Sequence, residues 1–452
     1  MLLKKASTNL TLLAFQLIED ADKSPQENKD TKLAFEERVK DLIHEVKGAG
    51  LLYEKTSEDF HDCIILELRI ALPVGQDEFL TPKELSLLTL GGKLEQLNPN
   101  IGQTLVFWTK LEESCPVDLN LAQDFLRYLH LCEPGDSPYL SEGKLFGSTI
   151  YEHENFDKDA SFKHTWLWFE SHRQTRDLVQ KRLHELKKLL CYRSKILKSF
   201  QQAQASSKKA DSLYPNIKGL SQGVKERIDL QSADPSQVVP LKKRLAELDF
   251  LKTSLKDISI AGFKLSEEIR YLRYNYRTID INAFNYQTEL GLIKKDILPG
   301  DSLHFLYEFY LRSQKQFLKQ ISGDLSYIIP SYDLANQTIA VIRGYLEIEQ
   351  TRCERELQTL TENENEREAD RDKKLQDTVE SIGMALGATA IIASYSGQLE
   401  KPWRWPWSSD SSSYPHPFIT YVFGSLLLAW MFYRMAFWIK RRKEAPSQGD
   451  DK

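Results

Sequence analysis

The sequence predicts an α+β N-terminal domain, then long antiparallel helices and a stalk helix, and finally a two-helix transmembrane hairpin. Three observations support this order. β-branched and aromatic runs alternate with amphipathic helices up to about residue 170, only helical periodicity follows, and two apolar stretches lie near the C-terminus. The 452 residues, with 41% hydrophobic residues and a net charge of −5, have the composition of a folded chain. They lack the uniformly basic character of proteins that bind a nucleic-acid duplex.

The first predicted domain, residues 1–170, is an α/β cytoplasmic domain with a mixed sheet. Helices are expected at residues 32–47 and 119–131. Another begins at Thr81, because Thr81-Pro82-Lys83-Glu84 has a capping-box pattern with proline at the first helical position. The strands are expected at residues 9–18, 63–72, 104–110, 145–151 and 165–169.

Cysteine usage and the absence of a signal peptide indicate a reducing compartment for most of the chain. The five cysteines contain no CxxC pair and do not cluster, so neither a disulfide framework nor a zinc site is expected. The first apolar run is interpreted as a strand rather than a signal peptide. Polar residues interrupt it, and Glu19 and Asp20 follow it without a small-residue cleavage site.

The second predicted domain, residues 171–330, is an antiparallel helical assembly. Apolar residues recur at helical spacing from Arg173 to Ala210, and Pro215 is expected to open a looser connection after them. The period resumes after Pro240 and, past a turn at Pro299, continues in a further helix.

A stalk helix is predicted over residues 331–380. Ile342, Leu346 and Cys353 belong to a seam with spacings of four and seven, which is typical of a coiled coil. Residues 361–374 are almost entirely polar, and they fit either a solvated linker or a polar stretch of the stalk.

The transmembrane hairpin is predicted over residues 381–439. Residues 418–439 carry one charge, and their length of about 33 Å is enough to cross a bilayer core. Residues 381–399 are uncharged and rich in Gly, Ala and Ser, which fits a span or a buried soluble helix. Lys and Arg precede the first segment, and four more follow the second at residues 440–443, the start of the tail (residues 440–452). The hairpin is therefore expected in the inner (plasma) membrane, with both termini in the cytoplasm.

The two spans differ in side-chain size, and this difference suggests an arrangement. The second span is bulky and suits contact with lipid, whereas small residues in the first permit close helix packing. One interpretation places copies of the first span around the axis of a homo-oligomer. The other is a single hairpin anchor. The residues that would line a pore are Gly383, Gly387, Ala390 and Ser394.

No catalytic motif occurs in the sequence, so neither an enzyme nor a cofactor is expected. Glu152-His153-Glu154, with Asp157 and Asp159 nearby, offers oxygen and imidazole ligands to a divalent ion. A charged loop after a strand would give the same residues, and the sequence therefore leaves any metal site unknown.

A basic helix face is the main candidate for ligand binding. Arg270, Arg273 and Arg277 lie at positions i, i+3 and i+7, and Tyr274 lies among them. Arginine side chains beside aromatic rings suit an anionic cytoplasmic ligand that carries a phosphate and a base. The alternative is a solvated face whose arginines pair with Glu267, Glu268 or another helix.

The order of the elements resembles the CorA-like divalent-cation transporters, chiefly from about residue 300 onward. In that family five chains form a funnel, the first span lines the pore, and a Gly-Met-Asn signature at its outer end selects hydrated magnesium. The resemblance implies a homo-oligomeric ion channel or transporter with a cytoplasmic regulatory region. At the outer end this chain has Tyr395-Ser396-Gly397, and its Gly383-Met384 pair lies near the inner end. Magnesium selectivity is therefore not implied.

The same resemblance supports a second interpretation. Divergent CorA-like proteins include membrane effectors of bacterial defence systems that nucleotide signals gate from the cytosol. The chain would then be a membrane-anchored sensor or scaffold, and its hairpin would only tether it.

Overall fold

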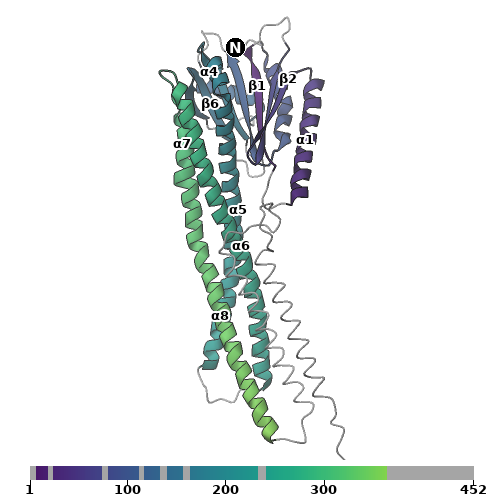
Figure 1. Ribbon diagram of the computed structural model, residues 1–452, viewed down its shortest axis with the longest axis vertical. Coiled ribbons are helices and arrows are strands. Elements are labelled where there is room, and N and C mark those ends of the chain that lie inside the picture. Colours follow the sequence, from purple (N-terminus) through teal and green to yellow (C-terminus); the bar gives the residue numbers. More distant parts are fainter. Residues whose placement is uncertain are drawn as a thin grey trace, which may run out of the picture. The chain divides into compact units, whose positions relative to one another are not determined.

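The computed structural model describes residues 7–18, 24–73, 80–110, 117–132, 140–155, 163–232 and 241–363. These residues form an N-terminal α/β domain followed by long helices (Figure 1). One mixed sheet has the strand order β2-β3-β1-β4-β7-β6-β5, in which only β4 and β7 pair in parallel. The strands are β1 (Asn9–Leu17), β2 (Leu52–Phe60), β3 (Cys63–Ala71), β4 (Gly102–Lys110), β5 (Leu140–Leu145), β6 (Ser148–Asn155) and β7 (Lys163–Glu170).

The helices fall into a short N-terminal set and a long C-terminal set. The short set comprises α1 (Pro25–Gly48), α2 (Pro82–Leu88), the 3-10 segment η2 (Leu90–Leu97) and α3 (Leu119–Tyr128). The later set comprises α4 (Thr175–Lys181), α5 (Leu183–Ser232), α6 (Leu241–Ile293), the short 3-10 segment η3 (Lys294–Asp296), α7 (His304–Arg312), a π-helical turn (Ser313–Phe317) and α8 (Leu318–Asn363).

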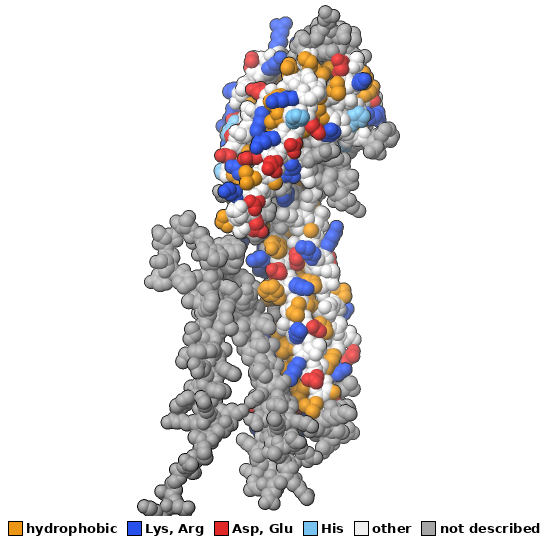
Figure 2. Space-filling model, turned by 90° about the vertical axis from the view of Figure 1, so that its right-hand side faces the viewer, with side chains coloured by type: hydrophobic (Ala, Val, Ile, Leu, Met, Phe, Trp, Pro, Cys, Tyr) orange, Lys and Arg blue, Asp and Glu red, His pale blue; other side chains and the backbone are white. Residues whose placement is uncertain are grey.

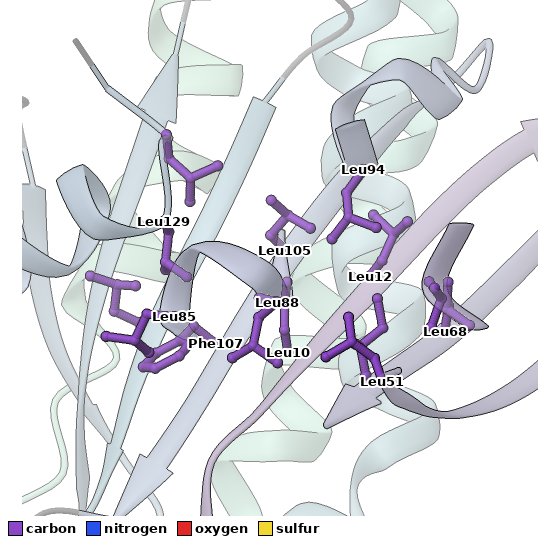
Figure 3. Close-up of a cluster of buried hydrophobic side chains, with 14 of the residues drawn as sticks. Leu10, Leu12, Leu51, Leu68, Leu85, Leu88, Leu94, Leu105, Phe107 and Leu129 are labelled. Atoms are coloured by element: carbon purple, nitrogen blue, oxygen red, sulfur yellow. The ribbon is translucent and has the colours of Figure 1, made fainter. Parts of the chain in front are cut away.

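One face of the sheet builds a leucine-rich core. Strand residues alternate between the two faces of a sheet, so Leu10 and Leu12 of β1 lie on the same face as Leu105 and Phe107 of β4. The short helices cover this face with their own apolar residues, and Figure 3 shows the leucines that meet there. This core holds the sheet in place and leaves the opposite face for the later helices.

Two capping boxes set the first turns of the short helices. The Ser24 hydroxyl accepts from the backbone N–H of Glu27, whose carboxylate accepts from the backbone N–H of Ser24, and Pro25 follows the cap. Thr81 and Glu84 form the same arrangement, which confirms the expected helix start. The cap at Ser24 starts α1 seven residues before the predicted residue 32.

The strand predictions are confirmed for β1, β3, β4 and β7, with two differences elsewhere. The sequence does not predict β2, because LYEKTSEDF is polar. This strand lies at the edge of the sheet and is exposed, so it buries few side chains and needs no apolar pattern. The strand expected at residues 145–151 is wrong. β5 ends at Leu145 and β6 begins at Ser148, and the turn between them places Phe146 and Gly147 at positive φ.

The interruption expected at Pro215 is also wrong, because α5 continues through it to Ser232. A proline inside a helix costs a backbone hydrogen bond. Here Ile217 and Val224, which follow Pro215 in the helix, are buried. The burial of these apolar side chains offsets the cost of the lost hydrogen bond.

The described residues form two compact units. One comprises described residues of Met1–Asp211 and Glu268–Ile328, and the other those of Ser212–Glu267 and of the chain from Ile329 onward. In the first unit α5 and α6 are antiparallel, since Lys188 lies near Glu289 and Lys209 near Glu268. Acidic, basic and apolar side chains are interspersed on the face that Figure 2 displays.

In the second unit α6 and α8 are antiparallel, since Arg244 pairs with Glu349 and Gly262 lies against Ala335. The predicted seam residues Ile342 and Leu346 pack there in a core with Val224, Leu248, Leu251 and Leu255 of the same chain. The described part of the predicted stalk is therefore one helix of an intramolecular helical cluster.

No helix among the described residues has the length and apolarity needed to cross a bilayer. The predicted hairpin at residues 381–439, the tail after it and the polar stretch from residue 364 to 374 lie outside the described residues.

Gly143 of β5 gives a direct test of how α7 packs on the sheet in the first unit. A Cβ atom at Gly143 would lie 2.1 Å from the ring of Phe305 on α7, so Gly143→Ala should destabilise the protein by about 1 to 3 kcal/mol. The control is Gly291→Ala in α6, where no atom lies within 4 Å of the added Cβ. Thermal unfolding should show a lower Tm only for Gly143→Ala, and equal Tm values would contradict the packing of α7 on β5.

Candidate functional site

The second face of the sheet is polar and aromatic. Its residues form a continuous row across five strands, because Arg69, Thr11, Val106, Trp166 and Glu152 are successive cross-strand neighbours. The next row places Glu67, Leu13, Thr104, His164 and Glu154 side by side in the same way. A face that packs against helices is ordinarily apolar, so this composition calls for a chemical explanation.

A cavity of about 280 Å³ lies between this face and the helices α4 and α5. Its walls include Trp108 from β4, Trp166 and Trp168 from β7, and Leu183 and Leu186 from α5. The volume is close to the lower end of the range of small-molecule sites. Figure 1 shows α4 and α5 on the opposite side of the sheet from α1. The cavity is thus separated from the leucine-rich core by the sheet itself.

The tryptophans form one aromatic group. The ring centroids of Trp108 and Trp168 lie 4.7 Å apart, and those of Trp166 and Trp168 lie 6.2 Å apart with nearly perpendicular planes. Trp108 Nε1 donates to Glu170 and Trp166 Nε1 to Glu152, at 2.9 and 3.3 Å. Trp168 Nε1 is buried and has no acceptor among the described residues. A hydrogen-bond acceptor on a ligand bound beside Trp168 would satisfy this indole N–H.

Cationic side chains outnumber acidic ones on the cavity wall. Arg69, Arg176 and Lys187 line it, against one carboxylate, Glu67. Glu67 accepts from Arg69 Nε at 2.8 Å and lies 2.6 Å from Lys187 Nζ. Burial opposes ionisation of Glu67, but Lys187 and Arg69 outweigh it and lower its pKa. Arg176 Nε also pairs with Glu170 at 2.8 Å, and Arg69 lies 3.6 Å from Glu54. The cavity therefore combines aromatic rings with cationic donors, and these two features together suit an anionic ligand with a planar ring.

A buried charge network adjoins the cavity through Trp166. The side chain of Arg193 on α5 is 1% exposed, and it contacts Glu154 and lies 3.5 Å from Glu152. Arg312 of α7 donates to both carboxylate oxygens of Glu154, at 2.7 and 2.8 Å. The guanidinium carbon of Arg193 also lies 4.4 Å from the centre of the Phe309 ring. The network thus joins β6 to α5 and α7.

His164 extends the network across β7. Its Nε2 lies 2.8 Å from Glu152 Oε1, and its Nδ1 lies 3.0 Å from the Thr104 hydroxyl. Although burial opposes ionisation, Arg193 and then His164 lower the pKa of Glu152 to about 2. Glu152 is therefore a carboxylate at neutral pH and accepts from both His164 and Trp166.

The structure separates the residues of the metal motif considered above. Glu152 and Glu154 lie on the polar face, where arginines and His164 engage them, whereas His153 lies on the other face of the same strand. No group of three or more His, Cys, Asp or Glu side chains among the described residues is placed to hold a metal ion. Asp157 and Asp159 lie outside those residues.

The predicted arginine face lies on α6, away from any wall of the cavity. Arg270, Arg273 and Arg277 are exposed, Tyr274 is 56% exposed, and the Arg270 guanidinium carbon lies 5.1 Å from the Tyr271 ring centre. Within the described part of the chain, no carboxylate is within ion-pair distance of these three arginines, and Glu268 instead lies near Lys209. The predicted pore residues Gly383, Gly387, Ala390 and Ser394 lie outside the described residues.

Sequence reasoning missed the cavity, although a signal for it exists. In β7, sequence KHTWLWFE, the residues His164, Trp166, Trp168 and Glu170 alternate with Thr165, Leu167 and Phe169. This period of two marks one polar-aromatic face and one apolar face. The partners on β1, β3 and α5 are distant in sequence, and only the sheet order brings them together.

Comparisons with family models, curated proteins and solved structures found no match to this chain. The chemistry of the cavity and of the charge network therefore carries the functional argument.

Arg193→Met tests the buried network. The change leaves Glu152 without its arginine in a buried site, and losing one partner of a buried ion pair costs about 3 to 5 kcal/mol. The matched control is Arg277→Met, an exposed position where the effect should stay within about 0.5 kcal/mol. Thermal unfolding of the full chain in detergent measures both variants. A Tm for Arg193→Met equal to that of the control would show that the network does not stabilise the fold.

Proposed function

We propose that this chain is a multi-pass membrane protein of CorA-like build whose cytoplasmic N-terminal domain binds a small anionic ligand. In this proposal the hairpin at residues 381–439 assembles as a homo-oligomeric ion channel or transporter, and both termini face the cytoplasm. The single observation that carries the regulatory part is the tryptophan-lined, cationic cavity on the sheet. The apolar and charge pattern of the C-terminal sequence supports the membrane part.

The ligand class follows from the cavity chemistry. Trp108, Trp166 and Trp168 provide aromatic faces and edges for a planar ring, and Arg69, Arg176 and Lys187 provide charge-assisted donors. A small heteroaromatic anion of the nucleotide type has both features. A simple ion such as phosphate would use the donors only, and an uncharged nucleoside would use the rings only.

The alternative function is a membrane-anchored sensor or scaffold whose hairpin only tethers it. The same cavity supports this alternative equally, because ligand binding in the N-terminal domain does not require a pore. Oligomeric state in mild detergent separates the two. A defined ring favours the channel, and a monomer or loose dimer favours the anchor.

Ligand binding is tested with adenosine monophosphate, adenosine and inorganic phosphate as probes in a thermal-shift assay on the full chain. Adenosine monophosphate should raise the Tm most, because it alone has both ring and charge. Arg176→Gln should weaken its binding about 10- to 100-fold, since a charge-assisted hydrogen bond contributes about 1.5 to 3 kcal/mol. Arg176 is largely exposed but pairs with buried Glu170, which keeps its hydrogen bond from Trp108, so the Tm of the ligand-free variant is measured first to separate folding from binding.

Two controls accompany this test. Arg173→Gln removes an exposed arginine three residues earlier that does not line the cavity, and it should bind as the wild type does. Arg273→Ala/Arg277→Ala removes two arginines of the α6 face. Weaker binding only in that double variant would assign the site to α6. No shift with any probe would reject a nucleotide-like ligand for the cavity.

The proposed pore is tested by ion flux in reconstituted vesicles. Gly387→Leu should abolish flux, because a bulky side chain would block close packing of the small-residue span. Leu426→Ala on the second span should retain most of the flux, since that residue would face lipid. Assembly in detergent is measured in parallel. Equal flux from both variants would contradict an axial position for the first span.

A further inference from the structure

Two buried cysteines from distant parts of the chain meet at one end of the sheet. Cys63 is the first residue of β3, directly after the turn at His61 and Asp62, and Cys191 lies on α5. Their Sγ atoms are 3.6 Å apart. A disulfide requires about 2.05 Å between the sulfur atoms, so a shift of about 1.5 Å would join them, a distance that side-chain rotation can supply.

The two thiols have different acidities. The hydrogen bond from Cys191 lowers the pKa of Cys63 against the opposing effect of burial, and Lys195 lowers it further. Burial raises the pKa of Cys191 well above its ordinary value. The Phe60 carbonyl, 3.1 Å from Cys63 Sγ, favours the protonated thiol, so ionisation of Cys63 depends on Cys191 and Lys195. The pair therefore consists of a nucleophile and a protonated partner.

We propose that Cys63 and Cys191 form a redox site that closes to a disulfide when a peroxide oxidises it. The Cys63 thiolate attacks one oxygen of hydrogen peroxide, the O–O bond breaks, and Cys63 becomes a sulfenic acid while hydroxide leaves. The sulfur of Cys191 then attacks the Cys63 sulfur, the S–S bond forms, and water leaves with the thiol proton. The two cysteines lose two electrons, and of the two peroxide oxygens one leaves as hydroxide and the other as water.

Both cysteines are buried, but the residues directly before Cys63 are closer to solvent. His61 is exposed and Asp62 is half-buried, and both precede Cys63 directly in the turn. Lys195, which pairs with Asp62, lies one helical turn after Cys191. Local opening of this hairpin end would be the route by which a small neutral peroxide reaches the pair.

Closure would affect the cavity wall. The disulfide would tie β3 to α5, and these two elements supply Glu67, Arg69 and Lys187 to the cavity. Oxidation is thereby expected to alter the spacing of its charged groups. The inference does not depend on the identity of the ligand or on the existence of a pore.

The experiment treats the full chain with hydrogen peroxide, blocks remaining thiols, and analyses peptides by mass spectrometry without reduction. Wild type should yield a peptide that joins Cys63 to Cys191 and that dithiothreitol separates, together with a higher Tm after oxidation. The Cys132→Ser control removes a cysteine outside the pair and should keep the link. Free Cys63 and Cys191 after treatment, or a link that forms only in unfolded protein, would overturn the proposal.

A second variant tests the order of the steps. Cys191→Ser removes the resolving thiol, so dimedone should label a sulfenic acid at Cys63. In Cys63→Ser, Cys191 should stay unlabelled because its thiol is protonated. Labelling of Cys191 rather than Cys63 would overturn the assigned roles, and disulfides of Cys63 with another cysteine in wild type would overturn the pairing.

Discussion

The N-terminal unit depends on how it accommodates the buried guanidinium of Arg193. A charge at 1% exposure is tolerated only where opposite charges meet it, and Glu152 and Glu154 do so from one strand. Both carboxylates reach Arg193 only in the observed register of β6, in which Glu152 lies opposite Trp166 and Glu154 opposite His164. A slip of β6 by one residue would turn both carboxylates into the leucine-rich core. The ion pairs therefore specify the sheet register and the position of α5 together.

Such a network is costly, and its persistence suggests a role beyond stability. Apolar residues of similar volume often stabilise a core as well as or better than buried ions. Nε and Nη1 of Arg193 are buried without a hydrogen-bond partner among the described residues, which adds to the cost. The polar face borders a cavity through Trp166, and a site for a charged ligand needs polar side chains held in fixed positions. The proposed ligand binding would account for this composition, which packing alone does not require.

Much of the fold was predictable from sequence because its signals are local. The capping box at Thr81 and the β-branched and aromatic runs of β1, β3 and β4 are each contained in a few residues. Two of the failures share one cause, which is that packing against residues distant in sequence decided the outcome. β2 forms because β3 offers it an edge, and α5 continues through Pro215 because its apolar residues are buried around that position.

The candidate site was less predictable for the same reason. Its residues come from β1, β3, β4, β7 and two helices, and no short motif contains them. The arginines of α6 were singled out because their spacing is visible in sequence, yet spacing on a helix does not create a cavity. Trp108, Trp166 and Trp168 give no comparable signal, because a tryptophan in a strand is ordinarily part of a core.

α5 links the features of this unit. Leu183 and Lys187 line the cavity at positions i and i+4, and Cys191 follows at i+8. Leu186 and Leu190 also line the cavity, and Arg193 comes one helical turn after Leu190. A ligand or a disulfide that moved α5 would move Arg193 relative to Glu152 and Glu154. Because Arg193 is buried, such a movement would require a second arrangement in which its charge is again paired. The same helix continues without a break to Ser232, and α6 and α8 also continue from one unit into the other. The position of α5 at Arg193 is therefore one physical quantity through which binding at the sheet would act on the rest of the chain.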